Sequence, residues 1–252
     1  MQHVVPAEST FKDHFSAQSA GYARHRPRYP RKLFEFLAGL GGRRRAWDCA
    51  TGTGQAAVAL AEVFEEVIAT DASQAQIDAA VSHPRVSYRV ATAEDCGLPA
   101  GSVDLVTVGQ ALHWFDTRRF FAEASRVLAS GGVLAAWCYE LCRVSPDCDR
   151  IIRRLYSDIV GPYWPPERRL IEERYSAIEF PGSGLAAPAL AMSARWSVED
   201  MLGYLRTWSA CHRYRREQGG DPVERIEGEL RAAWGAAPLT ARWPLTVKVV
   251  RL

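Results

Sequence analysis

The stretch RAWDCATGTGQAAVALAEVF, residues 45–64, is the feature that most restricts the fold of this chain. A short apolar run, 45–50, breaks at a loop that contains Gly52 and Gly54. The chain then continues as a segment, 55–64, whose apolar residues are spaced for one face of a helix. Glycines at such a turn permit backbone conformations and a close approach to a ligand that larger residues hinder. The stretch therefore predicts a strand, a ligand-binding loop and a helix in succession.

The chain continues this alternation of apolar strands and amphipathic helices as far as residue 141. Strands are predicted at 65–70, 86–92, 102–110 and 133–139, and helices at 31–40, 73–82 and 117–129. This order is typical of an α/β protein with a doubly wound, mostly parallel sheet, whose ligand lies beyond the carboxyl ends of the strands. The last residues, 240–252, alternate apolar and polar positions, which predicts a strand that returns to the sheet.

These patterns divide the chain into three regions. Residues 1–30 are polar and interrupted by prolines, and we interpret them as an N-terminal lid segment. Residues 31–141 and 231–252 form the predicted α/β core. Residues 142–230 are rich in helical patterns and aromatic side chains. They predict a helical cap that is inserted before the last strands and lies over the ligand face.

The glycine loop permits two interpretations. Residues 52–57, GTGQAA, fit the G-x-G-x-x-A pattern of dinucleotide-binding proteins, which would indicate a nicotinamide-dependent dehydrogenase. However, Asp48 lies at the mouth of the loop, where a carboxylate would repel a pyrophosphate and favour a ligand that carries positive charge. A second acid, Asp71, ends the next predicted strand. The two acids favour the second interpretation, a site for a cationic ligand.

The loop and three later segments together resemble the class I S-adenosylmethionine-dependent methyltransferases over about residues 20–140. The later segments are ATDAS (69–73), ATAEDCGLP (91–99) and VDLVTVGQALHWFD (103–116). The resemblance implies a Rossmann-like methyltransferase fold with a seven-stranded sheet, S-adenosylmethionine as the cofactor, and methyl transfer to a small molecule. A narrower resemblance, to the subgroup around fungal-type trans-aconitate methyltransferase, is carried by GYARHRPRYP, GQALHWFD, GPYWPPER, GYLRTWSACHRY and ARWPLTVKVVR.

The resemblance to the superfamily also implies roles for individual residues. Asp71 would accept hydrogen bonds from both ribose hydroxyls of the cofactor, and Asp48 would favour its cationic methionine end. Gly52 and Gly54 would let the backbone approach it. The further cofactor contacts implied are Ala72, Ala93, Glu94, Gln110, Tyr22 and Arg26.

One position departs from the superfamily pattern. The loop of these enzymes usually reads D-x-G-x-G-x-G, and this chain has Ala50 at the first glycine. Alanine is small enough for a close approach, but it fits the loop without strain only where its φ is negative. A negative φ at Ala50 is therefore the condition for tight cofactor binding at this loop, whereas the fold does not depend on it.

His113 and Trp114 follow the fourth predicted strand, close to the transferred methyl group in this fold. His113 is the candidate catalytic residue as a general base, and the alternative is that it shapes the pocket. A carboxylate acceptor is already ionised at neutral pH and needs no base, whereas a phenol or an amine would need one. The predicted substrate-binding residues are Trp114, Tyr163, Trp164, Tyr204 and Trp208.

Several classes of function are disfavoured. The formal net charge is only +2, and the fourth strand lacks the N/D-P-P-Y/F stretch of enzymes that methylate base amines, so nucleic acid is not an expected partner. The start resembles no signal peptide, and no apolar run is long enough for a membrane span. The six cysteines include no C-x-x-C pair, so we expect reduced thiols and no metal site.

These observations predict a cytoplasmic, monomeric methyltransferase that acts on a small molecule, with a carboxylate oxygen as a candidate acceptor. Two alternatives stay open from the sequence. One is an O- or N-methyltransferase of an aromatic metabolite. The other is a protein that binds S-adenosylmethionine without catalysis.

Overall fold

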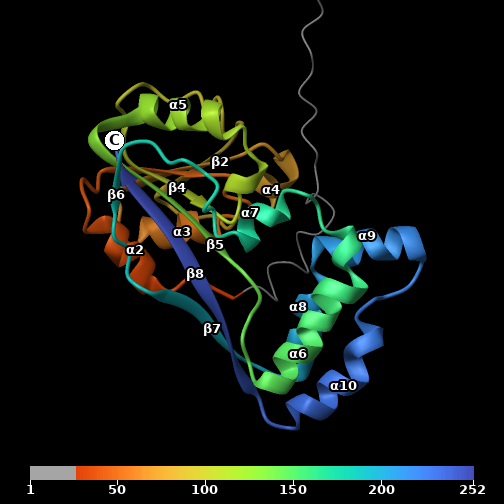
Figure 1. The fold of residues 1–252 in the computed structure, drawn as a ribbon. Coiled ribbons are helices and arrows are strands. Elements are labelled where there is room, and N and C mark those ends of the chain that lie inside the picture. Colours follow the sequence, from red (N-terminus) through yellow and green to blue (C-terminus); the bar gives the residue numbers. More distant parts are fainter. Residues whose placement is uncertain (1–26) are drawn as a thin grey trace, which may run out of the picture.

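The computed structural model describes residues 27–252, and its centre is an eight-stranded sheet (Figure 1). The strand order is β3-β2-β1-β4-β5-β8-β6, and β7 also pairs with β8. The first five strands are parallel to one another, and β8 is antiparallel to β5. The predicted doubly wound, mostly parallel fold is confirmed. The strands are β1 (Arg45–Cys49), β2 (Glu66–Asp71), β3 (Val86–Val90), β4 (Val103–Gly109), β5 (Leu128–Tyr139), β6 (Ser183–Leu185), β7 (Leu190–Trp196) and β8 (Leu239–Arg251).

Helices cover both faces of this sheet. Helix α5 (Thr117–Val127) packs on one face, where Phe120 and Ala124 join Trp47 of β1 in one apolar cluster. Helices α2 (Arg31–Ala38) and α3 (Gln55–Ala61) pack on the other face in a second cluster with Ala46. Adjacent residues of β1 thus point to opposite cores, and this explains why Ala46 and Trp47 are both apolar and buried. The short helix α4 (Gln74–Asp78) follows β2.

The region 142–230, predicted as a helical cap, contains the strands β6 and β7 as well as helices. Residues 190–196 form β7, which pairs antiparallel with the first half of β8 from Leu190 opposite Leu245 to Trp196 opposite Leu239. The reason is the length of β8, whose 13 residues extend beyond the end of β5. That extension exposes an unpaired edge, and β7 satisfies its backbone groups.

The helices of the cap pack against this extension. Figure 1 shows β7 and β8 leading from the core toward α6, α8 and α10. The buried Trp243 of β8 lies in one apolar cluster with Met201, Leu205 and Trp208, and its indole Nε1 donates to Oη of Tyr204 at 3.2 Å. The cap helices are α6 (Pro146–Arg154), α7 (Arg168–Glu172), α8 (Val198–Arg206), α9 (Ser209–Gln218) and α10 (Glu224–Trp234).

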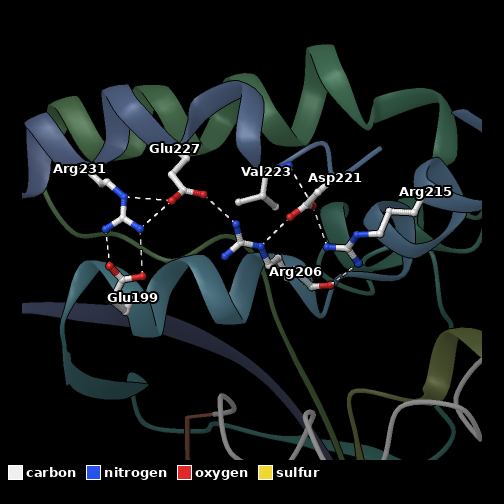
Figure 2. A network of polar contacts seen from close by, with 7 residues as sticks. All are labelled: Glu199, Arg206, Arg215, Asp221, Val223, Glu227 and Arg231. Carbon is white, nitrogen blue, oxygen red and sulfur yellow. Dashed lines mark hydrogen bonds and ion pairs between the residues drawn. The ribbon is translucent and has the colours of Figure 1, made fainter. Parts of the chain in front are cut away.

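A chain of ion pairs joins three of these helices (Figure 2). Arg206 of α8 binds Asp221 at 2.6 Å and Glu227 of α10 at 2.7 Å. Arg231 of α10 binds the same Glu227, at 2.6 Å, and also Glu199 of α8. Arg215 of α9 binds Asp221 at 2.8 Å. Each of these three arginines thus forms ion pairs with carboxylates of the cap.

No helix within residues 27–252 is long and apolar enough to cross a bilayer. All six cysteines are buried and unpaired. Their thiols therefore contribute to apolar packing rather than to cross-links.

Candidate active site

The site begins at the carboxyl end of β1, where Asp48 is buried. Its Oδ1 accepts a hydrogen bond from Oγ1 of Thr107 at 2.7 Å, and its Oδ2 accepts one from Oγ1 of Thr51 at 2.6 Å. Burial raises the pKa of this carboxyl to about 6, and the two threonine hydrogen bonds partly oppose that rise. Asp48 is therefore ionised at neutral pH but poorly solvated, so a nearby cation would stabilise it.

The loop after β1 contains a strained residue that the sequence did not indicate. Ala50 has φ of +53°, in the left-handed region, so the condition of a negative φ at this position is not met. The turn has a structural reason. It directs the amide of Thr51 to the carbonyl of Thr70 and the amide of Gly52 to the carboxylate of Asp71, both at 2.9 Å. Alanine accepts this conformation at a cost that glycine would not incur.

Gly54 is required at its position for two reasons. Its φ is +85°, and a Cβ atom there would lie 2.1 Å from Oη of Tyr88. That hydroxyl is itself fixed, because it donates to the carbonyl of Val81 at 2.7 Å. The backbone thus passes directly under a side chain of β3 before α3 begins.

Asp71, at the end of β2, is oriented by the backbone on both sides. One carboxylate oxygen accepts from the amide of Gly52 and the other from the amide of Ser73, each at 2.9 Å. A carboxylate oxygen can accept more than one hydrogen bond, so both oxygens can still accept from a ribose. Ala72 lies between these contacts, and Ser73 caps α4, where its side chain accepts from the amide of Gln76.

The next strand ends carry the other predicted cofactor residues. Ala93 is buried, and Oε1 of Glu94 accepts from the amide of Asp116 at 3.0 Å. Gln110 has φ of +59°, and its side-chain amide pairs with the backbone of Tyr139 in both directions, at 2.8 and 3.3 Å. Gln110 therefore ties the end of β4 to the end of β5. Its contact with the cofactor stays a prediction.

A pocket lies at the carboxyl ends of β4 and β5, between the core and the cap. Tyr163 is outside it, because its ring packs on Tyr214 at 5.0 Å between centroids. The other predicted substrate residues and the candidate base all line it. These are Trp114 and His113 from the core, and Trp164, Tyr204 and Trp208 from the cap.

His113 is buried against the cap rather than open to water. Its Nδ1 lies 3.4 Å from Oη of Tyr175, and its ring is 4.7 Å from that of Trp114. Burial, together with the positive charge of Arg168, lowers the pKa of His113 to about 3. The imidazole is therefore neutral at physiological pH and holds a proton only weakly, so it is a poor general base there.

Arg168 is the pocket residue that the sequence analysis missed. It begins α7, and its guanidinium lies 4.9 Å from the ring centroid of Trp164 and 5.4 Å from that of Tyr156. Its Nε donates to Oη of Tyr156 at 2.9 Å. The segment GPYWPPER contained the signal, but the chain has many arginines and the sequence does not show which one faces a pocket. Tyr22 and Arg26 lie outside the described residues.

This geometry fits the cofactor implied by the sequence. Two carboxylates, Asp48 and Asp71, flank a loop whose conformation depends on Gly52 and Gly54. Asp48 is buried and ionised at neutral pH, and Asp71 has oxygens that can accept further hydrogen bonds. Their roles toward the sulfonium and the ribose stay predictions.

Comparison with known proteins supports the same assignment. The model of a family described as a methyltransferase domain matches residues 47–136. A protein of Dictyostelium discoideum, named as a candidate methyltransferase, is 33% identical over 239 residues, which cover 93% of this chain and 91% of the relative. A Saccharomyces cerevisiae protein, named as a candidate S-adenosylmethionine-dependent methyltransferase, is 31% identical over 145 residues, 54% of this chain and 49% of that one.

A solved structure matches nearly the whole molecule. It is that of a candidate type II methyltransferase from Anaeromyxobacter dehalogenans, which is 48% identical to this chain. The match has a TM-score of 0.85 and covers 90% of this chain and 97% of that one. The similarity therefore includes the cap as well as the core.

Proposed function

The chain belongs to the S-adenosylmethionine-dependent methyltransferases, and from that premise we propose that it methylates a carboxylate oxygen of a small molecule. Its cofactor is S-adenosylmethionine, so the dehydrogenase interpretation of the glycine loop is set aside. When bound, the cofactor supplies an activated methyl group on a sulfonium. The bond from oxygen to methyl forms as the bond from sulfur to methyl breaks, and the sulfonium becomes a neutral thioether.

The observation that carries this proposal is the pocket at the carboxyl ends of β4 and β5. It is lined by the rings of Trp114, Trp164, Tyr204 and Trp208, and it lies where parallel α/β sheets bind ligands. A pocket closed by side chains of the cap favours a small molecule over a polymer. We extend the proposal to the partners: a small molecule rather than nucleic acid or membrane, and a monomeric enzyme.

The nature of the acceptor is inferred from His113. A phenol or an amine must lose a proton during methylation, and a histidine with a pKa of about 3 is a poor group to receive it. A carboxylate has an ordinary pKa of about 4, so at neutral pH it needs no base. In that case the protein contributes by positioning the acceptor and excluding water. The resemblance to the trans-aconitate subgroup supports the same acceptor class.

A direct test is a methyl-transfer assay with S-adenosylmethionine and separate panels of di- and tricarboxylates, phenols and amines. We expect turnover with carboxylates and a product that alkali hydrolyses to methanol, as a methyl ester does. An alkali-stable product from a phenol or an amine would contradict the carboxylate proposal. It would favour the second candidate, an aromatic metabolite methyltransferase, which the ring-lined pocket also suits.

The pH dependence of this assay gives a second test, because His113 does not titrate near neutral pH. The folded-state pKa of His113 is lowered, so it stays neutral from pH 6 upward. We expect kcat to show no ionisation attributable to this residue in that range. The substitution His113→Asn keeps a neutral polar group and should change kcat less than the roughly 100-fold that loss of a general base causes.

A further inference from the structure

We propose that Arg168 selects the methyl acceptor by holding one carboxylate of a polycarboxylate while a different carboxylate receives the methyl group. This inference rests on the proposed function, since it names the residue that would recognise that acceptor class. The proposed function requires only one carboxylate in the acceptor, whereas this inference requires at least two acidic groups.

The first argument is the ion-pairing state of Arg168 compared with three other arginines of the cap. Arg169 binds Glu173, Arg174 binds Glu140, and Arg206 binds Asp221 and Glu227. Arg168 differs, because it makes no ion pair with any residue of the described range 27–252. Its described polar contact is the phenol of Tyr156, which in turn donates to a carboxylate oxygen of Glu172. The guanidinium of Arg168 thus interacts mainly with two aromatic rings and a hydroxyl rather than with a carboxylate.

The second argument is the geometry of the guanidinium. The ring of Trp164 and the hydrogen bond from Nε to Tyr156 fix its position. The two terminal nitrogens of Arg168 have no hydrogen-bond partner in the described part of the chain. These nitrogens form the fork that binds a carboxylate through two parallel hydrogen bonds. A rigid guanidinium with its fork available loses little entropy when it binds an anion.

The third argument is the charge of the cavity that this fork borders. Arg168 lines the acceptor pocket beside His113, Trp164 and Trp208. Glu140 is the carboxylate side chain in that lining, and it is already paired with Arg174. Arg168 also borders a neighbouring cavity, in which the carboxylates of Glu140, Asp149 and Glu172 are matched by the guanidinium groups of Arg143, Arg153 and Arg168. The acceptor pocket is the one of the two that also contains His113 and Trp114, so an anion held there lies beside the end of β4.

The positive charge of Arg168 also influences the part of the site that follows β4. Its positive charge contributes to the lowered pKa of the buried His113. A carboxylate bound at Arg168 would thus lie within the same pocket as the residues that follow β4, where the methyl group is delivered. The two functions require different carboxylates. The lone pairs of a carboxylate that accept hydrogen bonds from the guanidinium are less available for attack on carbon.

The transfer then balances without a proton. In the acceptor, a second carboxylate oxygen forms the new bond to the methyl carbon while the bond from sulfur to that carbon breaks. The electron pair of the broken bond stays on sulfur, and Arg168 remains protonated throughout. One free carboxylate must remain for Arg168, so we expect a monomethyl ester and no diester from a dicarboxylate, and no triester from a tricarboxylate.

The test compares wild type with Arg168→Met, Arg168→Lys and the matched control Arg169→Met. Arg169 is the next residue in α7, and it is exposed and paired with Glu173. The probes are glutarate and tricarballylate, titrated into each protein loaded with S-adenosylhomocysteine. Tryptophan fluorescence reports binding, because the guanidinium lies on the ring of Trp164. Methyl-transfer kinetics with the same acids supply KM and kcat separately, and thermal melts show that each variant is folded.

We expect Arg168→Met to raise the dissociation constant and KM of the acids by about 10- to 100-fold, the loss expected for a charge-assisted hydrogen bond. Affinity for S-adenosylhomocysteine should not change. Arg168→Lys should restore part of the acid affinity, since lysine keeps the charge but lacks the fork. Arg169→Met should match wild type. Tyr156→Phe, which removes the hydroxyl that positions Arg168, should have a smaller effect than Arg168→Met.

The outcomes separate this inference from the proposed function. Loss of acid binding in Arg168→Met, without methyl transfer to any acid in wild type, would support the anion site and contradict carboxylate methylation. Methyl transfer to acids with an unchanged KM in Arg168→Met would support the proposed function and overturn the role of Arg168. Failure of wild type to bind either acid, or equal turnover of glutarate and its monomethyl ester, which has an acceptor carboxylate but none for Arg168, would also overturn it.

Discussion

The two sides of the site are built by different means. On the core side, backbone amides and carboxylates at the ends of β1 and β2 form the cofactor loop, and their geometry is set by the loop's own conformation. On the cap side, the pocket consists of side chains, mainly rings and Arg168, whose positions depend on packing among separate elements. The comparison indicates that cofactor binding and acceptor binding should be separable by mutation.

The largest expected effect is on the core side, at Asp71. Replacement by alanine removes a carboxylate that can bind both ribose hydroxyls, and charge-assisted hydrogen bonds contribute about 1.5–3 kcal/mol each. We expect cofactor affinity to fall by about 100-fold or more, measured by calorimetry. The exposed Asp78→Ala in α4 is the control and should not change affinity. Unchanged affinity in Asp71→Ala would refute the ribose assignment.

The next effect is on the cap side, at Trp208. Its buried ring lies 5.6 Å from that of Trp164 and 6.0 Å from that of Tyr204. Trp208→Ala leaves a cavity that costs about 3–5 kcal/mol and should raise the acceptor KM while cofactor affinity stays constant. Tyr163→Ala, outside the pocket, is the comparison variant and should leave KM unchanged. A parallel loss of cofactor affinity in Trp208→Ala would show that the two sides are coupled.

A smaller effect is expected at Asp48, whose negative charge lowers the stability of the fold but should favour cofactor binding. Its folded-state pKa of about 6 lies above the ordinary value of 3.8, because burial disfavours the charge. The folded state therefore binds more protons between these values, and this group makes stability fall as pH rises from about 4 to 6. Asp48→Asn should raise the free energy of unfolding at pH 7 by about 1–3 kcal/mol and weaken cofactor binding.

The measurement for Asp48 is the difference in melting temperature between wild type and Asp48→Asn across this pH range. The difference should be large at pH 7 and nearly vanish at pH 4, where wild-type Asp48 is protonated in the folded state. A difference that does not depend on pH would mean that the carboxylate is better solvated than its burial indicates. Stronger cofactor binding by the variant would refute its role beside the cationic end.

The contrast between the two sides also explains what the sequence could predict. The core could be predicted because local patterns determine it. These patterns are the apolar strands, the glycine loop, and the acids at the ends of β1 and β2. In the cap, the aromatic residues Trp164, Tyr204 and Trp208 were identified by type. Strand β7 and Arg168 were missed, because the first depends on the length of β8 and the second on how α7 places one guanidinium in the pocket.

Ala50 is the position where local reasoning failed even in the core, and it provides the smallest and most specific prediction. Its left-handed conformation costs an alanine about 1–2 kcal/mol, which glycine does not incur, although glycine loses about 0.5–1 kcal/mol more backbone entropy on folding. We therefore expect Ala50→Gly to raise stability by no more than about 1 kcal/mol, measured by chemical denaturation. Because the loop already has the required conformation, cofactor affinity should barely change. A large gain in affinity would instead show that the Cβ of Ala50 obstructs the cofactor, and the loop would then limit binding through contact rather than through backbone strain.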